Sequence, residues 1–220
     1  MPPRNVAVLA HLVGFLIGAA LYAMLFALVA RRRVRIGRPT TEVGDDRLPL
    51  LTAVLGLIWN VTMLAAYAIR DFAGREPDPT LIATAYSALG FLPAVVVHSV
   101  LRSQSRAEAR RAARAFIWLA YAISTISTIL LYQGGSVLAL QILTWSYALL
   151  TIPVLLLTVR RRAVPADWSI LALAVFAVSA LHLSHAEVGH ESWVIEVIGH
   201  HSSIALIFAI LYLDFRFALA

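Results

Sequence analysis

The sequence predicts an all-α membrane protein that folds as a seven-transmembrane helix bundle. Three observations carry this prediction: 60% of the 220 residues are hydrophobic, only 14% are charged, and long apolar runs alternate with short polar connections. A soluble domain typically has about 25% charged residues and roughly 45–50% apolar ones. The composition is therefore that of a chain surrounded by lipid, and we expect the bilayer to be its main partner.

Seven segments are long and apolar enough to cross a membrane, because about 20 residues at 1.5 Å rise span the ~30 Å hydrocarbon core. Polar, glycine or proline residues interrupt the apolar pattern after each segment. No internal repeat or long linker is present, so we expect a single domain over residues 1–220. The predicted spans are 5–30, 48–69, 79–102, 113–133, 136–159, 166–188 and 193–217.

The start of the chain is typical of a permanent anchor. Only Arg4 precedes the first apolar run, and that run has the length of a full span. No small-residue cleavage site followed by a soluble domain is present, which argues against a cleaved signal peptide. We therefore expect the first span to stay in the membrane.

Arginine placement predicts the orientation of the bundle. Fifteen of the 18 basic residues lie in alternate connections and at the carboxyl end, and only Arg4, Arg70 and Arg75 lie on the other side. Basic residues accumulate on the cytoplasmic side of membrane proteins. The amino terminus is therefore predicted outside and the carboxyl terminus in the cytoplasm. The net charge of +6 then divides into +9 inside and −3 outside, and its explanation by membrane topology excludes nucleic acid as a partner.

Two residue types are missing from the sequence, and their absence excludes several kinds of chemistry. All 18 basic residues are arginine, so the chain cannot carry retinal as a lysine Schiff base. It has no cysteine, which excludes disulfides and thiolate metal ligands.

Histidine is concentrated near the outer side of the predicted bundle. Six of the seven histidines fall in the outer third, and only His98 lies near the inner end of its span. Ionisable groups inside spans are costly and mark functional sites. His182 and His185 share a helix face, as do Glu196 and His200, because residues three or four apart are neighbours on a helix. The last two spans are joined by about four residues and must be antiparallel neighbours.

This arrangement predicts a metal or haem site between spans one, six and seven. Imidazole and carboxylate together suit Zn, Fe or Cu, whereas haem b would need two histidines on facing helices and a wall of small residues such as Gly14 and Gly18. A protonation-sensing polar network stays open as an alternative. The predicted ligands are His11, His182, His185, Glu196 and His200, with His190, His201, Glu187 and Glu191 as secondary candidates. The residues predicted to hydrogen bond to them are Ser179, Ser203, Gln141 and Tyr86.

Two polar residues lie apart from this predicted site. His98 and Asn60 are each interpreted as helix-linking hydrogen-bond contacts rather than ligands, because polar side chains in spans commonly bridge neighbouring helices.

Three stretches resemble the amino-terminal seven-helix membrane region of certain bacterial sensor histidine kinases. They are Gly90–Ser99, Ala180–His185 and, in the last span, Gly199–Ser203 followed by Ala209–Ala218. The resemblance implies a sensory input domain in the bacterial inner membrane, which signals through its last helix and the amphipathic exit at Asp214 and Arg216. It also implies a cytoplasmic kinase module after residue 220, since residues 1–220 contain no ATP site and no phospho-acceptor module.

Other functions stay open at the level of sequence. One is a membrane haem protein that transfers electrons. Another is an intramembrane metal-dependent hydrolase, in which Glu196 or Glu187 would act as the base for a metal-bound water. If the chain is a sensory domain, we expect no catalysis within residues 1–220. The oligomeric state stays open, and a homodimer is one alternative.

Overall fold

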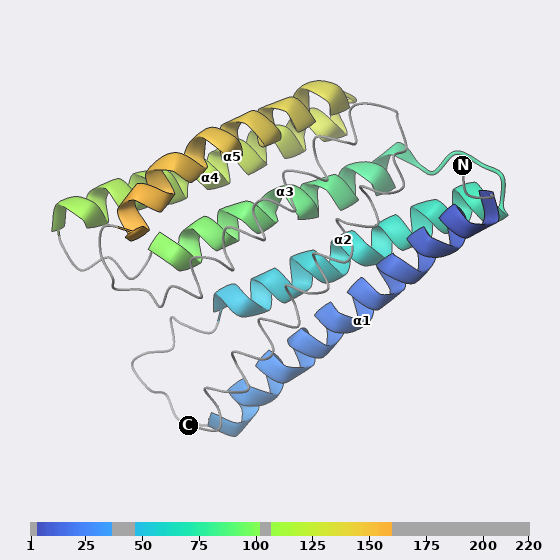
Figure 1. Ribbon diagram of the computed structural model, residues 1–220, viewed down its shortest axis with the longest axis horizontal. Helices are drawn as coiled ribbons and strands as arrows, with labels where there is room; N and C mark the ends of the chain where they lie inside the picture. Colours follow the sequence, from blue (N-terminus) through green and yellow to red (C-terminus); the bar gives the residue numbers. More distant parts are fainter. Residues whose placement is uncertain (1–3, 37–46, 102–106, 160–220) are drawn as a thin grey trace.

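The computed structural model describes residues 4–36, 47–101 and 107–159, which form five long helices (Figure 1). No strand occurs within these ranges, and each helix contains a stretch long and apolar enough to cross a membrane. The predicted spans 166–188 and 193–217 lie outside the described residues. The helices are α1 (Arg4–Ile36), α2 (Arg47–Phe72), α3 (Pro79–Leu101), α4 (Ala107–Tyr132) and α5 (Ser136–Val159).

The helix boundaries confirm five of the predicted spans to within a few residues, except at two arginine-rich ends. α4 begins at Ala107 rather than at the predicted residue 113, and α1 continues through Arg31 to Ile36 instead of ending near residue 30. Arginine, alanine and glutamate are good helix formers. The hydrocarbon thickness limits the apolar part of a span, but a helix can continue beyond it into water.

Neighbouring helices in the sequence are also neighbours in space. α1 packs on α2, α2 on α3, α3 on α4 and α4 on α5, while α3 also contacts α5. The short connections make successive helices antiparallel (Figure 1). As a result, the start of α1, the α2–α3 connection and the α4–α5 turn lie at one end of the bundle.

The α4–α5 turn shows how the sequence reverses the chain within three residues. Gly134 has φ 85°, a left-handed conformation that glycine adopts without steric cost. The Gly135 N–H then donates to the Leu130 carbonyl at 2.8 Å, which satisfies one of the free carbonyls at the end of α4.

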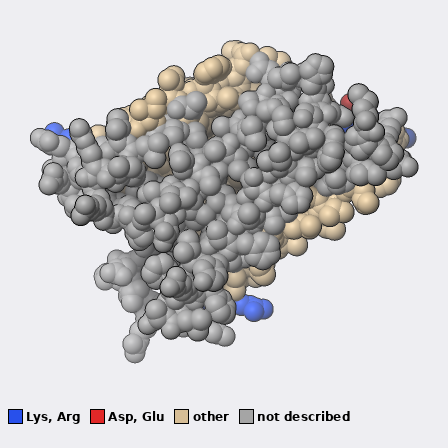
Figure 2. All heavy atoms as spheres, viewed as in Figure 1, with Lys and Arg blue, Asp and Glu red and all other residues tan. Residues whose placement is uncertain are grey.

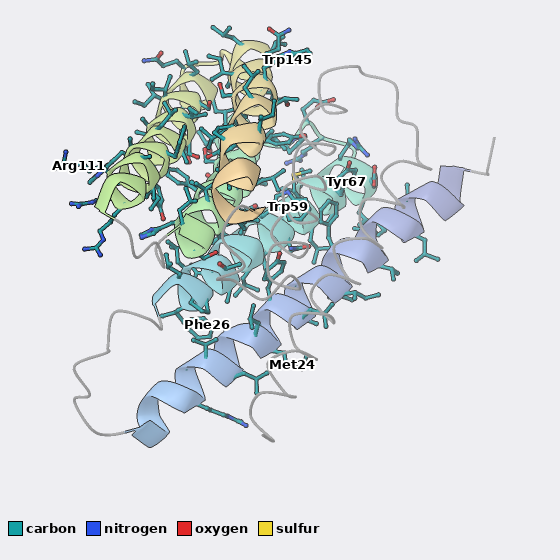
Figure 3. All side chains as sticks on the ribbon, turned by 60° about the vertical axis from the view of Figure 1, so that its left-hand side comes forward. Met24, Phe26, Trp59, Tyr67, Arg111 and Trp145 are labelled. Carbon is teal, nitrogen blue, oxygen red and sulfur yellow. The ribbon has the colours of Figure 1, made fainter. Side chains whose placement is uncertain are left out.

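Charged side chains of the described residues lie at the two ends of the bundle (Figure 2). Arg111 extends from the start of α4, while Trp145 is exposed on α5 (Figure 3). Between the ends, large apolar side chains are exposed, including Leu9, Trp118 and Leu149 at 62%, 74% and 67%. An exposed apolar belt between charged ends is the surface that a bilayer requires.

The core is built around α3 and uses small residues at the helix contacts. Ala85, Ala94, Ala120 and Ala139 are fully buried. Small side chains let helix backbones approach closely, which is the main source of helix packing in membranes. Among the described helices, α3 contacts α2, α4 and α5.

Candidate functional site

Most of the predicted outer site lies outside the described residues. This applies to His182, His185, Glu196 and His200, to the secondary candidates His190, His201, Glu187 and Glu191, to Ser179 and Ser203, and to the exit residues Asp214 and Arg216. His11 belongs to α1, about two turns after its start at Arg4.

Two of the predicted hydrogen-bonding residues are described, and they differ in environment. Tyr86 on α3 is half-buried and packs against the core, whereas Gln141 on α5 is exposed. Within the part of the chain that the structure describes, no three histidine or acidic side chains come close enough to hold a metal ion.

An aromatic cluster begins one turn below His11. Phe15 on α1 packs edge-on against Trp59 of α2, with ring centroids 5.8 Å apart. It also stacks on Tyr67 of α2, with ring centroids 5.4 Å apart and planes inclined by 29°. Figure 3 shows Trp59 and Tyr67 along α2. Aromatic pairs of this kind are worth ~0.5–1.5 kcal/mol beyond the area that they bury, so they fix the first half of α1 against α2.

A charged pair borders this aromatic cluster near the C-terminal end of α2. The Arg70 guanidinium lies 4.5 Å from the centre of the Tyr67 ring, and its Nε donates to Asp71 Oδ1 at 3.2 Å. The Asp71 side chain is only 11% exposed, and its second oxygen has no hydrogen-bond partner among the described residues. A cation over a tyrosine face and beside a carboxylate is stabilised by both.

The helices α1 and α2 approach each other closely at Gly18 and Gly56. A side-chain carbon at Gly18 would collide with Asn60 Oδ1, and one at Gly56 would collide with the ring of Tyr22. Asn60 is 2% exposed, and its Nδ2 donates to the Gly56 carbonyl of its own helix at 2.7 Å. Asn60 therefore does contact the neighbouring helix as predicted, although the described hydrogen bond stays within α2.

A buried group of hydrogen bonds that was not predicted from the sequence joins α3, α4 and α5. Ser124 Oγ donates to the Gly90 carbonyl at 2.8 Å and lies 2.6 Å from the Tyr147 hydroxyl. The Tyr147 hydroxyl is also 3.0 Å from the Ala120 carbonyl, to which it donates. A sequence pattern could have indicated these hydrogen bonds, because two neighbouring spans each carry a pair of polar residues three positions apart. The pairs are Ser124 with Ser127 and Thr144 with Tyr147.

His98 links two helices, as predicted. Its Nδ1 lies 3.2 Å from the Tyr121 hydroxyl of α4, and the two rings pack edge to face at 5.8 Å. Three more residues of α3 follow His98, up to Leu101, so this contact lies at the end of the bundle opposite the α4–α5 turn.

Comparison of the chain with protein-family models, with curated proteins and with solved structures found no match in any of the three.

Proposed function

We propose that the chain is a membrane-embedded sensory input domain of a histidine-kinase-type signalling protein. Its ligand site would lie in the outer third of the bundle, with His182, His185, His200, His11 and Glu196 as ligands of a transition metal or haem. The observation that carries the proposal is the concentration of six of the seven histidines on the outer side. Ionisable groups at that depth are costly without a functional partner.

The described helices support this proposal by supplying a firm frame for one side of such a site. The Phe15–Trp59–Tyr67 cluster and the Gly18–Asn60 contact hold α1 close to α2. His11 follows one turn outward from Phe15 on the same helix. At Gly18 the surface of α1 is already covered by Asn60, so a haem wall would have to begin further outward.

Signalling would work by a shift between two packings of the last span. Zn, Fe, Cu or haem b would supply the change in coordination or redox state. The histidines of spans six and seven would bind the metal or haem more tightly in one packing than in the other. Only such a difference in affinity shifts the equilibrium between the two packings. The exit at Asp214 and Arg216 would pass the movement to a kinase module after residue 220, in a monomer or a homodimer.

The proposed setting is the bacterial inner membrane, with the amino terminus outside, and the natural absence of cysteine makes this orientation easy to test. We would place one cysteine in the α2–α3 connection by Glu76→Cys and another at the start of α4 by Arg111→Cys. Both positions are exposed, and they lie at opposite ends of the bundle. A membrane-impermeant maleimide should label only the Glu76→Cys variant in intact cells, and both variants after lysis. Labelling of only the Arg111→Cys variant in intact cells would reverse the orientation.

The site is tested by metal analysis and a visible spectrum of the purified protein. We expect stoichiometric Zn, Fe or Cu, or the bands of haem b, and we expect alanine at His182, His185 and His200 to abolish them. His98→Ala is the matched control, because His98 contacts Tyr121 near the opposite end of the bundle. Equal metal content in the triple variant, the control and the unmodified protein would overturn the proposed site.

The same preparation separates the sensory function from its alternatives. Sharp visible bands of a reduced bis-histidine haem that exchanges electrons with a soluble donor would favour the electron-transfer protein. Loss of metal without any change in the output of a linked kinase module would contradict sensing. Hydrolysis that depends on Glu196 or Glu187 would favour the metal-dependent hydrolase.

A further inference from the structure

Three buried hydroxyl groups on three different helices have no hydrogen-bond partner within the described part of the protein. They are Ser87 Oγ on α3, Ser127 Oγ on α4 and Thr144 Oγ1 on α5. Ser127 is fully buried as a residue. Buried hydroxyls are normally paired with protein or with ordered water, so three exceptions in one region need an explanation.

Other hydroxyl residues in the described helices bond to their own backbone. Thr84 donates to the Thr80 carbonyl at 2.7 Å, Thr125 to the Tyr121 carbonyl at 2.8 Å and Ser99 to the Val96 carbonyl at 2.8 Å. This local bond is the usual way for a helix to satisfy a serine or threonine. Ser87, Ser127 and Thr144 do not make it, so their donors are free for another group.

The helix register places the three hydroxyls in one layer. Ser87 is three residues before Gly90, Ser127 is three residues after Ser124, and Thr144 is three residues before Tyr147. Gly90, Ser124 and Tyr147 are joined by hydrogen bonds. Residues three apart share a helix face. Since α4 runs opposite to α3 and α5, all three steps lead in the same direction, toward the α4–α5 turn.

Different groups lie on the two sides of this layer along the bundle. One turn further toward the α4–α5 turn, Ala83, Leu131 and Ala139 form a small apolar cluster of buried residues. On the other side lie the bonded groups of Ser124 and Tyr147. Along the bundle, the three hydroxyls therefore lie between an apolar layer and a polar layer whose groups are hydrogen-bonded to one another.

The chemistry of the layer identifies its ligand. The three side chains are neutral hydroxyls, each able to donate one hydrogen bond and to accept others. They carry no charge that would hold a metal ion or an anion. A buried water typically makes about three hydrogen bonds to groups that are otherwise unsatisfied. We propose that Ser87, Ser127 and Thr144 bind an ordered water molecule in the seam between α3, α4 and α5.

A double-mutant cycle tests whether the hydroxyls share one ligand. Ser127→Ala and Thr144→Val should each lower the free energy of unfolding measured by denaturant titration in mixed micelles. The double variant should lose less than the sum of the two, because either change alone releases the same water. Thr125→Val is the matched control on α4, since Thr125 is exposed and bonds to its own helix. The change that Thr125→Val causes in the free energy of unfolding should simply add to the change caused by Ser127→Ala.

Radiolytic hydroxyl-radical labelling of the unmodified protein gives a second readout that does not depend on the variants' folding. A trapped water produces radicals beside the residues around it, so buried Tyr147 and Leu131 should be modified. Buried Phe15, in the aromatic cluster of α1 and α2, should not be modified. We expect labelling of Tyr147 at least about tenfold above that of Phe15. Additive effects in the cycle, a gain in stability from Ser127→Ala, or equal labelling of Tyr147 and Phe15 would each overturn the proposal.

Discussion

Gly18 of α1 lies directly against the side-chain oxygen of Asn60 on α2, and this contact sets how closely the first two helices approach. The arrangement depends on both residues. Glycine leaves room for the oxygen, while the bond from Asn60 Nδ2 to the Gly56 carbonyl holds the amide in place. Contacts of a glycine Cα–H with an oxygen recur at helix–helix interfaces.

Replacing Gly18 by alanine should destabilise the bundle by about 1–3 kcal/mol, because the new methyl group forces the Asn60 amide out of its position. The free energy of unfolding in mixed micelles measures the loss. In an Asn60→Ala background the collision is removed, so the same Gly18→Ala change should cost much less. Equal costs in the two backgrounds would show that Asn60 does not limit the approach of the helices.

Removing the Tyr147 hydroxyl should also destabilise the protein. Tyr147→Phe removes a buried hydroxyl whose one proton can go to the Ala120 carbonyl or to Ser124 Oγ, and we expect a loss of about 1–3 kcal/mol. Tyr132→Phe is the matched control, because it removes a similar 2.7 Å bond with Thr84 at an exposed site. Its cost should stay below about 0.5 kcal/mol. A larger loss for Tyr132→Phe than for Tyr147→Phe would contradict this ranking.

The start of α3 should carry a pH-dependent contribution to stability. Asp78 Oδ1 accepts bonds from the Thr80 hydroxyl and the Thr80 N–H, both at 2.7 Å, and these bonds lower the pKa of the Asp78 carboxyl from 3.8. A carboxyl with a lowered folded-state pKa stabilises the fold above its unfolded pKa. The contribution disappears as the pH falls through the folded-state pKa.

The midpoint temperature of unfolding should therefore fall slightly between pH 6 and pH 2. The part of this fall that comes from protonation of Asp78 should be absent in the Asp78→Asn variant. Asparagine keeps the helix-capping oxygen but does not titrate. Glu76→Gln serves as the control for a general effect of removing negative charge near this end. An unchanged pH profile in the Asp78→Asn variant would show that this carboxyl does not contribute.

Much of the helical frame could be predicted from the sequence. Length and apolar content locate α2, α3 and α5 within three residues of their observed ends, because the bilayer thickness imposes a length on every span. The same reasoning missed the start of α4 at Ala107. An arginine-rich helical turn outside the hydrocarbon has no apolar signature.

The candidate site could be predicted only in part. The helix-linking role of His98 followed from its residue type and depth. The side chain that His98 contacts could not be predicted, because a residue's position on its own helix does not reveal which side chain of the next helix faces it. The outer histidine site stays a prediction, since all but His11 among its ligands lie outside the described residues.

The sequence by itself determined the membrane class, the approximate spans and the division of charge between the two ends. These properties depend on composition and on the fixed rise of a helix, which are local quantities. Only the tertiary structure decided that Asn60 faces Gly18, that Ser124 meets Tyr147 and Gly90, and that three hydroxyls near them stay unpaired within the described helices. Those outcomes depend on the rotation and axial offset of each helix against its neighbours. Packing of the whole bundle sets both.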